Sequence, residues 1–458
     1  MVKKFSVADF GAFPNTNEFT STQIQKAIDT CFLNGGGEVI IPTGIYRVKG
    51  LRLRSNVTLH LMEFAMLLGS RDYKDYFVLD NDEIEPFDRA LLDPTDWERL
   101  YGEEKRIKFH KYGNRWHNAM IRAYGAENIS IIGERGSIID GDNCFDAGGE
   151  EKYRGPHGIG IITCKNVTLK GYTMRNTGNW AQEIQNTNNI LIENVICIAG
   201  HDGVHMTTCE NVVIRNCDFA TGDDCVAGFD NKDILVENCL LNTACSAFRM
   251  GGTNILIQNC DVYAPPKYLF RGSMSMEEKQ GSVMSNDAQF AKDFSRANTL
   301  SLFTYYADAS VNIKNLATNI VVRDCKVSGT QRFLHFNYSG NEPWQNNKPL
   351  LDIRFENITA ENIEMPLTAY GDSENPFELT LKNIEFSFRE GFEHNPFMHV
   401  ANFKKITLED ITVKNAKGEC LIKSWSKDGD VEFIGLNCSI PKDNLVKYTE
   451  EEFKCAWI

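Results

Sequence analysis

A short repeat constrains the fold of this chain more than any other feature of its sequence. Each repeat begins with Asn or Asp, followed by any residue and then two residues that are apolar except for Thr168, and successive starts are 23, 22, 22 and 21 residues apart. The starts are Asn166, Asn189, Asn211, Asp233 and Asn254. A period of this length is typical of a solenoid, in which each repeat is one turn that stacks on its neighbours. Three short β-rich runs per repeat predict an all-β chain folded as a right-handed parallel β-helix.

The repeat extends over most of the chain. It begins near residue 128 and, after an interruption, returns between residues 319 and 438. No leucine-rich consensus recurs, and a propeller would need units of about 40 residues. We therefore expect one β-helix domain over residues 1–458, interrupted by two insertions at 81–118 and 265–315.

The start of the chain predicts a cap. Apolar residues at 24, 27, 28 and 31 follow the spacing of one helix face, and three glycines at 35–37 end the helix. A solenoid exposes the apolar edge of its first turn unless something covers it. We expect residues 1–80 to form the N-terminal cap, with one short helix, and the first coils.

Charge and hydropathy restrict the partners. The net charge is −14 and no basic run occurs, so nucleic acid is not an expected partner. No apolar run approaches the roughly 20 residues of a membrane span, so no membrane partner is expected. The first residues, MVKKFSVADF, contain no apolar signal core, which predicts a cytoplasmic location. The oligomeric state stays open.

The cysteines follow the repeat. Cys217, Cys239 and Cys260 each come directly after an Asn, and their spacings of 22 and 21 residues are those of the repeat. This register predicts a ladder of buried free thiols that pack as small apolar residues. No C-x-x-C pair occurs among the 14 cysteines, which argues against zinc and redox motifs. We expect neither a metal nor a cofactor.

Three acids stand at related places in successive repeats. Asp202 and Asp224 are both 13 residues after a repeat start, and Asp223 precedes Asp224. Neighbouring strands lie about 4.8 Å apart, so these acids should form one patch. Sugar hydrolysis needs one protonated carboxyl and a second carboxylate, and repulsion between close acids keeps a proton on one of them. The alternative is that they are ordinary turn residues of a solenoid.

Sequence motifs carry a family resemblance. The segments VADFGA at 7–12, GGGEVIIPTGIY at 35–46 and SNVTLHL at 55–61, with Gly-Asp-Asp at 222–224, resemble the polygalacturonase family, glycoside hydrolase family 28. The likeness covers roughly residues 5–275 and is that of a divergent, bacterial-type member. It implies an inverting hydrolase that cleaves pectin-type, uronate-containing oligosaccharides. It also implies that Asp223 is the general acid and that Asp202 and Asp224 hold and activate water.

The chain departs from the family pattern in three motifs, and the family's Asn-Thr-Asp-Gly keeps only Asp202-Gly203, after Gly200-His201. The family's Gly-His-Gly histidine falls on Ser246, and its Arg-x-Lys motif keeps Arg271 but loses the lysine, whose charge Lys267 is placed to replace. These losses favour another uronate-containing or modified sugar over plain polygalacturonate. His205 is a further local candidate, and Trp180 and Trp344 are candidates for stacking on sugar rings. The expected substrate-binding residues are Arg271, Lys267, Arg249, Ser246, His201 and Trp180.

Two other functions are compatible with the same residues. A polysaccharide lyase or epimerase would hold Ca²⁺ with the three acids and use Arg271 or Lys267 as the base. A non-catalytic carbohydrate-binding β-helix would account for the missing histidine. Arg271 has a structural alternative as well, in which it pairs with Glu277 or Glu278, and the tryptophans have one as packing residues.

Overall fold

The computed structural model describes residues 2–76, 118–198, 200–280, 299–308, 313–338 and 348–450. Most of the first predicted insertion and parts of the second lie outside these residues. The chain divides into two compact units, so the predicted single domain stays a prediction. The first unit is Met1–His205, Cys209–Asp223 and Tyr268–Lys292, and the second is Met206–Thr208, Asp224–Lys267 and Asp293–Ile458.

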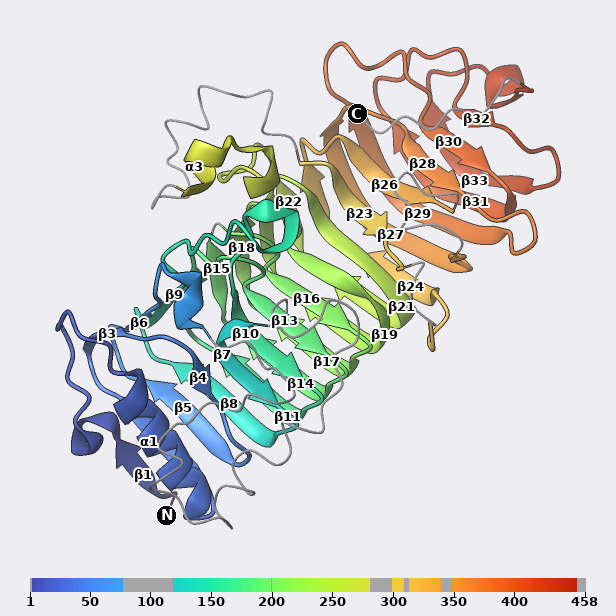
Figure 1. Cartoon of the computed structure of the whole chain (residues 1–458). Coiled ribbons are helices and arrows are strands. Elements are labelled where there is room, and N and C mark those ends of the chain that lie inside the picture. Colours follow the sequence, from blue (N-terminus) through green and yellow to red (C-terminus); the bar gives the residue numbers. More distant parts are fainter. Residues whose placement is uncertain are drawn as a thin grey trace. The chain divides into compact units, whose positions relative to one another are not determined.

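The first unit is a stack of coils whose strands pair in parallel with those of the next coil, in three columns (Figure 1). The first column is β1 (Lys4–Ser6), β2 (Gly37–Ile41), β5 (Val57–Leu61), β8 (Glu127–Gly133), β11 (Lys165–Lys170), β14 (Asn188–Glu193) and β17 (Glu210–Arg215). The second is β3 (Gly44–Arg47), β6 (Ala65–Leu68), β9 (Ile138–Asp140), β12 (Thr173–Arg175), β15 (Ile196–Ile198) and β18 (Asp218–Thr221). The third is β4 (Leu51–Arg52), β7 (Ala119–Tyr124), β10 (His157–Ile162) and β13 (Gln182–Gln185). The strand β16 (Val204–Thr207) is divided, and its residues up to His205 belong to this unit.

The second unit has the same architecture, with several strands long enough to serve two columns. The first column is β19 (Val226–Glu237), β21 (Ser246–Gln258), β24 (Thr318–Arg323), β27 (Asp352–Ile363), β29 (Phe377–Phe388), β31 (Phe403–Val413) and β33 (Asp430–Cys438). The second begins with β20 (Leu240–Thr243), β22 (Asp261–Tyr263) and β25 (Lys326–Ser328), and continues along β27. The third runs from the start of β21 through β23 (Ser301–Tyr305), β26 (Arg332–Asn337), β28 (Leu367–Tyr370), β30 (Met398–Ala401), β32 (Ile422–Ser424) and β34 (Val446–Tyr448). Both units therefore have the coils of the predicted right-handed parallel β-helix.

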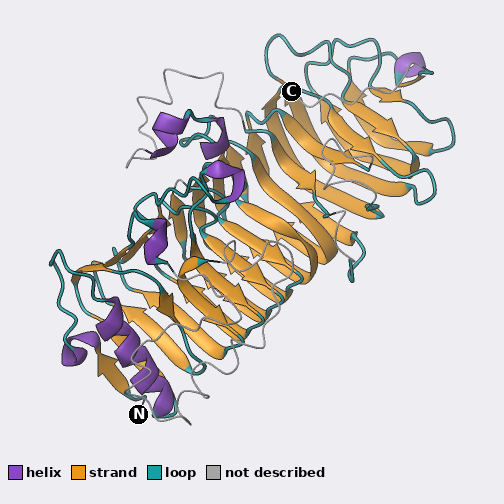
Figure 2. Cartoon of the chain, in the orientation of Figure 1, coloured by secondary structure: helices purple, strands orange, loops and turns teal. Residues whose placement is uncertain are grey.

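Helices are few beside the strands (Figure 2). The predicted capping helix is α1 (Ser21–Leu33), which buries its apolar face and is fixed to β4 by the side chain of Gln25, bonded to the backbone N–H and C=O of Arg52 at 2.7 and 3.0 Å. None of the described helices is both long and apolar enough to span a membrane. Among the described residues, the other helical segments are α3 (Met276–Gln280) and the 3₁₀ turns Val7–Phe10, Tyr73–Asp75, Glu150–Lys152, Arg271–Ser273 and Lys442–Asn444.

The repeated Asn has a physical cause. At each repeat start the backbone adopts a left-handed conformation with φ between 55° and 59°, which Asn and Asp tolerate better than other non-glycine residues. The side-chain amides also stack: Asn189 donates to Asn166 at 2.9 Å, and Asn211 donates to Asn189 at 3.2 Å. In the second unit Asn254 donates to Asp233 at 2.8 Å. The repeat is therefore a ladder of turns as well as a pattern of apolar residues.

The cysteines of the repeat are buried free thiols, as predicted. Cys217, Cys239 and Cys260 are buried, and each thiol donates to the carbonyl two residues earlier at 3.3 Å. All the described cysteines are free thiols. Burial raises the pKa of the Cys197 thiol to about 12, so this sulfur stays protonated and unreactive at neutral pH.

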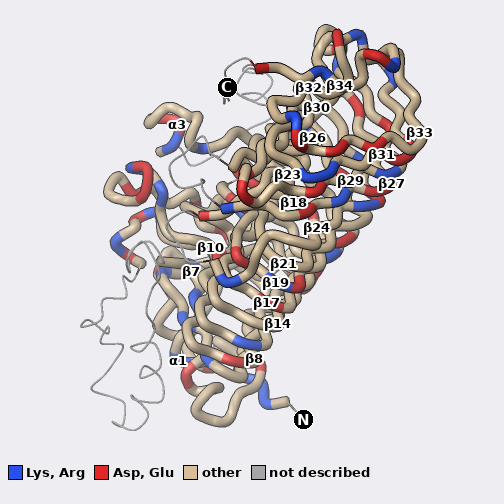
Figure 3. Tube along the Cα trace, turned by 90° about the vertical axis from the view of Figure 1, so that its right-hand side faces the viewer, with Lys and Arg blue, Asp and Glu red and all other residues tan. Residues whose placement is uncertain are grey.

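The first column of the second unit carries both signs of charge. Figure 3 shows Lys and Arg intermixed with Asp and Glu along β27, β29, β31 and β33. Lys404 pairs with Glu378 at 2.6 Å, and Lys382 pairs with Glu409 at 2.9 Å. Exposed pairs of this kind contribute little to stability. This face is therefore a solvated surface of mixed charge.

Candidate active site

The candidate acids lie on loops that leave the second column. Asp202 follows β15 and Asp223 follows β18, and in the first unit these loops touch at two glycines. A Cβ built on Gly222 would lie 2.7 Å from the carbonyl oxygen of Gly200, so only glycine allows this approach without a shift. The loops that carry Asp202 and Asp223 therefore approach each other closely at these two glycines.

Asp202 is buried and hydrogen-bonded to a histidine. Its Oδ2 lies 2.7 Å from Nδ1 of His205, and the imidazole of His205 stacks on the indole of Trp180 with ring centroids 3.5 Å apart and planes within 2°. The indole therefore holds the imidazole against the acid. Trp180 is half-buried and uses one ring face for this contact, so its predicted stacking on a sugar stays a prediction.

Asp223 has a cationic neighbour that the sequence did not indicate. Nη2 of Arg154 lies 3.6 Å from its Oδ2. Arg154 is itself held in place, because Nε donates to Glu151 at 3.1 Å and Nη1 donates to Asn179 at 3.0 Å. Arg154 stands outside the repeat, between β9 and β10, and its only sequence signal is the Gly155-Pro156 turn that follows it.

Asp224 is the first acid of the second unit. Its Oδ1 accepts a hydrogen bond from the backbone N–H of Ser246 at 2.8 Å, and Nη1 of Arg249 lies 3.6 Å from its Oδ2. The hydroxyl of Ser246 is hydrogen-bonded to Thr304 at 3.1 Å. The guanidinium of Arg249 lies 4.4 Å from the ring centroid of Tyr306, and its side chain is 24% exposed. Two of the predicted binding residues therefore contact this acid directly.

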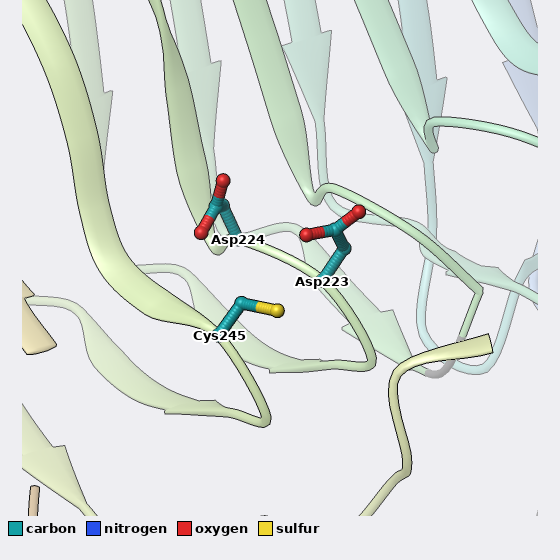
Figure 4. A group of neighbouring side chains, drawn as sticks. All are labelled: Asp223, Asp224 and Cys245. Atoms are coloured by element: carbon teal, nitrogen blue, oxygen red, sulfur yellow. The ribbon is translucent and has the colours of Figure 1, made fainter. Parts of the chain in front are cut away.

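The surroundings of Asp224 do not fit a calcium site. One of its carboxylate oxygens and Sγ of Cys245 lie within 4.8 Å of each other, and Figure 4 shows both residues with Asp223, the residue before Asp224. Calcium prefers oxygen ligands, whereas the sulfur of a thiol is a soft ligand. The guanidinium of Arg249 also occupies the space beside the carboxylate where a cation would compete with it.

Two predicted binding residues are buried in the first unit. Arg271 is fully buried, and its guanidinium donates to the carbonyls of Gly178 at 3.1 Å and Lys279 at 2.9 Å. Burial lowers its pKa to about 10. The guanidinium thus donates to backbone carbonyls, and its predicted contact with a substrate carboxylate stays a prediction. His201 is also fully buried and stacks on Tyr153, with centroids 5.7 Å apart.

Burial, reinforced by the charges of Arg154 and Arg271, lowers the pKa of His201 well below its ordinary value, so this imidazole is neutral.

The remaining candidates differ in exposure. Lys267 is exposed, and its Nζ lies 5.3 Å from the ring centroid of Tyr263. Trp344 lies outside the described residues. Lys267 and Arg249 are therefore the predicted cations with exposed surface.

The buried His335 of the second unit should make the free energy of unfolding sensitive to acid. Burial, followed by the charges of Arg332 and Arg249, lowers the pKa of His335 to about 3. The unfolded chain takes up this proton near pH 6.5, so its contribution to stability is complete above that pH and is lost as the pH falls towards 3. We expect His335→Gln to reduce the slope of unfolding free energy against pH by up to about 1.4 kcal/mol per pH unit in this window.

Urea unfolding at several pH values between about 4 and 7 measures this slope. The matched control is His394→Gln, the same substitution at an exposed histidine. A slope in the His335→Gln protein equal to that of the unmodified chain would contradict the expectation.

Comparison with known proteins places the acids in a family context. Residues 106–246 match the model of glycosyl hydrolases family 28. The chain is 26% identical over 244 residues to a probable polygalacturonase of Vitis vinifera. This match covers 50% of this chain and 45% of that protein. It is 24% identical over 251 residues to an exo-poly-alpha-D-galacturonosidase of Dickeya chrysanthemi, and this match covers 49% of this chain and 41% of that protein. The matches thus span less than half the length of either relative.

A solved structure supports the fold. The exopolygalacturonase of Thermotoga maritima superposes with a TM-score of 0.64 over 90% of this chain and 92% of that one, at 15% sequence identity. At this identity the likeness concerns the fold alone. It agrees with the parallel coils of both units and confirms the predicted β-helix.

Proposed function

We propose that this chain, a divergent member of glycosyl hydrolases family 28, hydrolyses the glycosidic bonds of pectin-type, uronate-containing chains. One observation carries the proposal. The segment that matches the family, residues 106–246, contains Asp202, Asp223 and Asp224, the acids that the repeat had already singled out. Fold alone would not support this step, because one fold carries many functions.

The contacts of the acids suit an inverting mechanism. In such a mechanism a carboxylic acid protonates the leaving oxygen while carboxylates activate a water on the opposite face of the sugar. We assign the first role to Asp223. Asp224 accepts a hydrogen bond from the backbone N–H of Ser246 and faces the guanidinium of Arg249, and these contacts fix its carboxylate, to which we assign the role of holding the water. Asp202 is assigned the same role, with His205 fixing its orientation.

The proton balance follows from these roles. The water oxygen bonds to the anomeric carbon as the bond from that carbon to the leaving oxygen breaks. The proton of Asp223 moves to the leaving oxygen, and a proton of the water moves to Asp202 or Asp224. Exchange with solvent then restores the starting state.

The uronate carboxylate needs a cation with exposed surface. Arg249 and Lys267 have it, whereas Arg271 is enclosed. Arg249 is also fixed by Tyr306, and a guanidinium suits paired contacts with a carboxylate. We propose that Arg249 binds the sugar next to the cleaved bond and that Lys267 assists.

Product analysis tests the reaction type. The protein is incubated with oligogalacturonates and with rhamnogalacturonan oligosaccharides, while reducing ends and the ultraviolet absorbance of a new C4–C5 double bond are followed together. Reducing ends without the absorbance are expected and would identify the substrate. Absorbance that rises in step would mean a lyase, and binding with no product at all would favour the carbohydrate-binding alternative.

A change at Arg154 should slow turnover. The guanidinium lies 3.6 Å from Asp223 and helps to fix the direction of its carboxyl, so its removal should misplace the general acid. We expect Arg154→Gln to lower kcat by about tenfold, as measured by initial rates of reducing-end release. The control is Arg175→Gln, because Arg175 pairs with Asp140 on the second column. An unchanged kcat in the Arg154→Gln protein would count against this role of Arg154.

The place of action stays a prediction. The proposed place of action is the cytoplasm, where the substrate would arrive as an oligosaccharide. Fractionation of cells that make the protein, with a cytoplasmic enzyme as reference, tests this part of the proposal.

A further inference from the structure

A row of side chains in the second unit leads away from Arg249. Thr304, His335 and Thr368 in the middle of the row are buried, whereas Arg249, His399 and Lys423 are partly exposed. Register along the third column pairs each residue with the next: Arg249, Thr304, His335, Thr368, His399 and Lys423. The residues that precede them alternate into the core and are fully buried, as Phe248 and Met398 are. Five strand steps of about 4.8 Å place Lys423 roughly 24 Å from Arg249.

An aromatic cluster lies at the far end of this row. Trp425 follows Ser424 of β32, and its indole meets the ring of Tyr370 at 6.0 Å and 85° and the ring of His399 at 5.3 Å and 86°. Trp425 and His399 are partly exposed. Two edge-on neighbours fix the indole, so a ligand would lose little side-chain entropy on binding it.

The cluster also has a cation. Nζ of Lys423 lies 5.2 Å from the ring centroid of Trp425. Burial lowers the pKa of His399 to about 4, helped by the charges of Lys423 and Arg332, so this imidazole is neutral near pH 7. In a chain of net charge −14, an aromatic surface with a lysine beside it is complementary to an anionic ligand that also has an apolar face. A uronate sugar has both features.

We propose that Trp425, Lys423, His399 and Tyr370 form a distal platform that binds an acidic sugar unit of the chain being cleaved. The proposal rests on the proposed function. The sugar's apolar face would lie on the indole and its carboxylate would meet Lys423. Because the platform and Arg249 are on one row, a long oligosaccharide engages both, and the second contact benefits from a high effective concentration.

Calorimetry on the whole chain tests this inference. In an Asp223→Asn background, which prevents turnover, a galacturonate trimer and a dodecamer are titrated into the protein. We expect Trp425→Ala and Lys423→Gln each to raise the dissociation constant of the dodecamer about tenfold. The trimer is too short to reach from Arg249 to Trp425, so its dissociation constant should change less than twofold. Trp425→Phe keeps an aromatic face and should recover most of the affinity.

The outcomes separate the two proposals. Dodecamer binding that is insensitive to both Trp425→Ala and Lys423→Gln would overturn the platform and leave the proposed function standing. If neither galacturonate oligomer binds, the platform for galacturonate is overturned, and the proposed function is then decided separately by the product analysis, which includes rhamnogalacturonan oligosaccharides. The control is Tyr448→Ala, an exposed aromatic on β34 outside the cluster, which should change neither affinity. Thermal unfolding of each variant checks that the fold is retained.

Discussion

Asp223→Asn is expected to lower kcat by about 10²–10⁴-fold, the range that a positioned general acid contributes. The amide has the size of the carboxyl but has no acidic proton to give to the leaving oxygen. Asp223 is 9% exposed and lies beside Arg154, so the substitution changes charge and leaves packing nearly intact. Initial rates of reducing-end release measure the effect, and circular dichroism with thermal unfolding confirms the fold.

The control for this prediction is Asp261→Asn. Asp261 is exposed at the start of β22, in a repeat without a candidate acid, and its replacement should leave the rate within about twofold. Full activity of the Asp223→Asn protein would remove the acid from the mechanism, and with it the inverting assignment. A matching loss in Asp202→Asn and Asp224→Asn would show that the acids act together, because effects within one catalytic unit do not add.

The fold could be predicted because its cause is local. Asn189 and its counterparts occupy left-handed turns and bond to one another through their amides, so each repeat start is visible as a single residue type at a fixed spacing. The cysteine ladder is visible for the same reason. The acids follow from it as well, since a constant offset from a turn means neighbouring positions in the stack.

The environment of the acids could not be predicted, because it is built from segments without a period. Arg154 reaches Asp223 from a segment between β9 and β10. Arg271 was predicted to bind substrate, but the carbonyl of Gly178, 93 residues away in the sequence, fixes it in the interior. Neither contact has a signature in spacing, since both depend on where an irregular loop folds back.

Histidine chemistry shows the same limit. The family motif led us to look for an imidazole at Ser246, where the structure has a hydroxyl bonded to Thr304. The imidazole that does bond to a candidate acid is His205, three residues after Asp202. Spacing within the repeat gave no reason to prefer it. Only the stacking on Trp180, from the previous coil, shows why this side chain faces the acid.

Gly228→Ala is expected to lower the free energy of unfolding of the second unit by more than about 4 kcal/mol, near the upper end of the range for single substitutions. Gly228 lies in β19 where the register with β21 shifts, and its φ is +133°, a conformation that favours glycine. An added Cβ would lie 1.7 Å from the carbonyl oxygen of Met206, a backbone atom that cannot move aside without shifting the strand. Urea unfolding gives the change in free energy.

A second glycine separates the clash from the backbone strain. Gly391 also has a positive φ, +92°, but a Cβ there would meet no atom within 4 Å. Gly391→Ala should therefore cost only the left-handed strain of an alanine, about 1–2 kcal/mol. Equal losses in the two variants would mean that β19 relaxes around the methyl group. A much larger loss at Gly228 would show that the bend leading from Asp224 into the first column depends on close backbone contact, which links the position of this acid to a residue that never touches substrate.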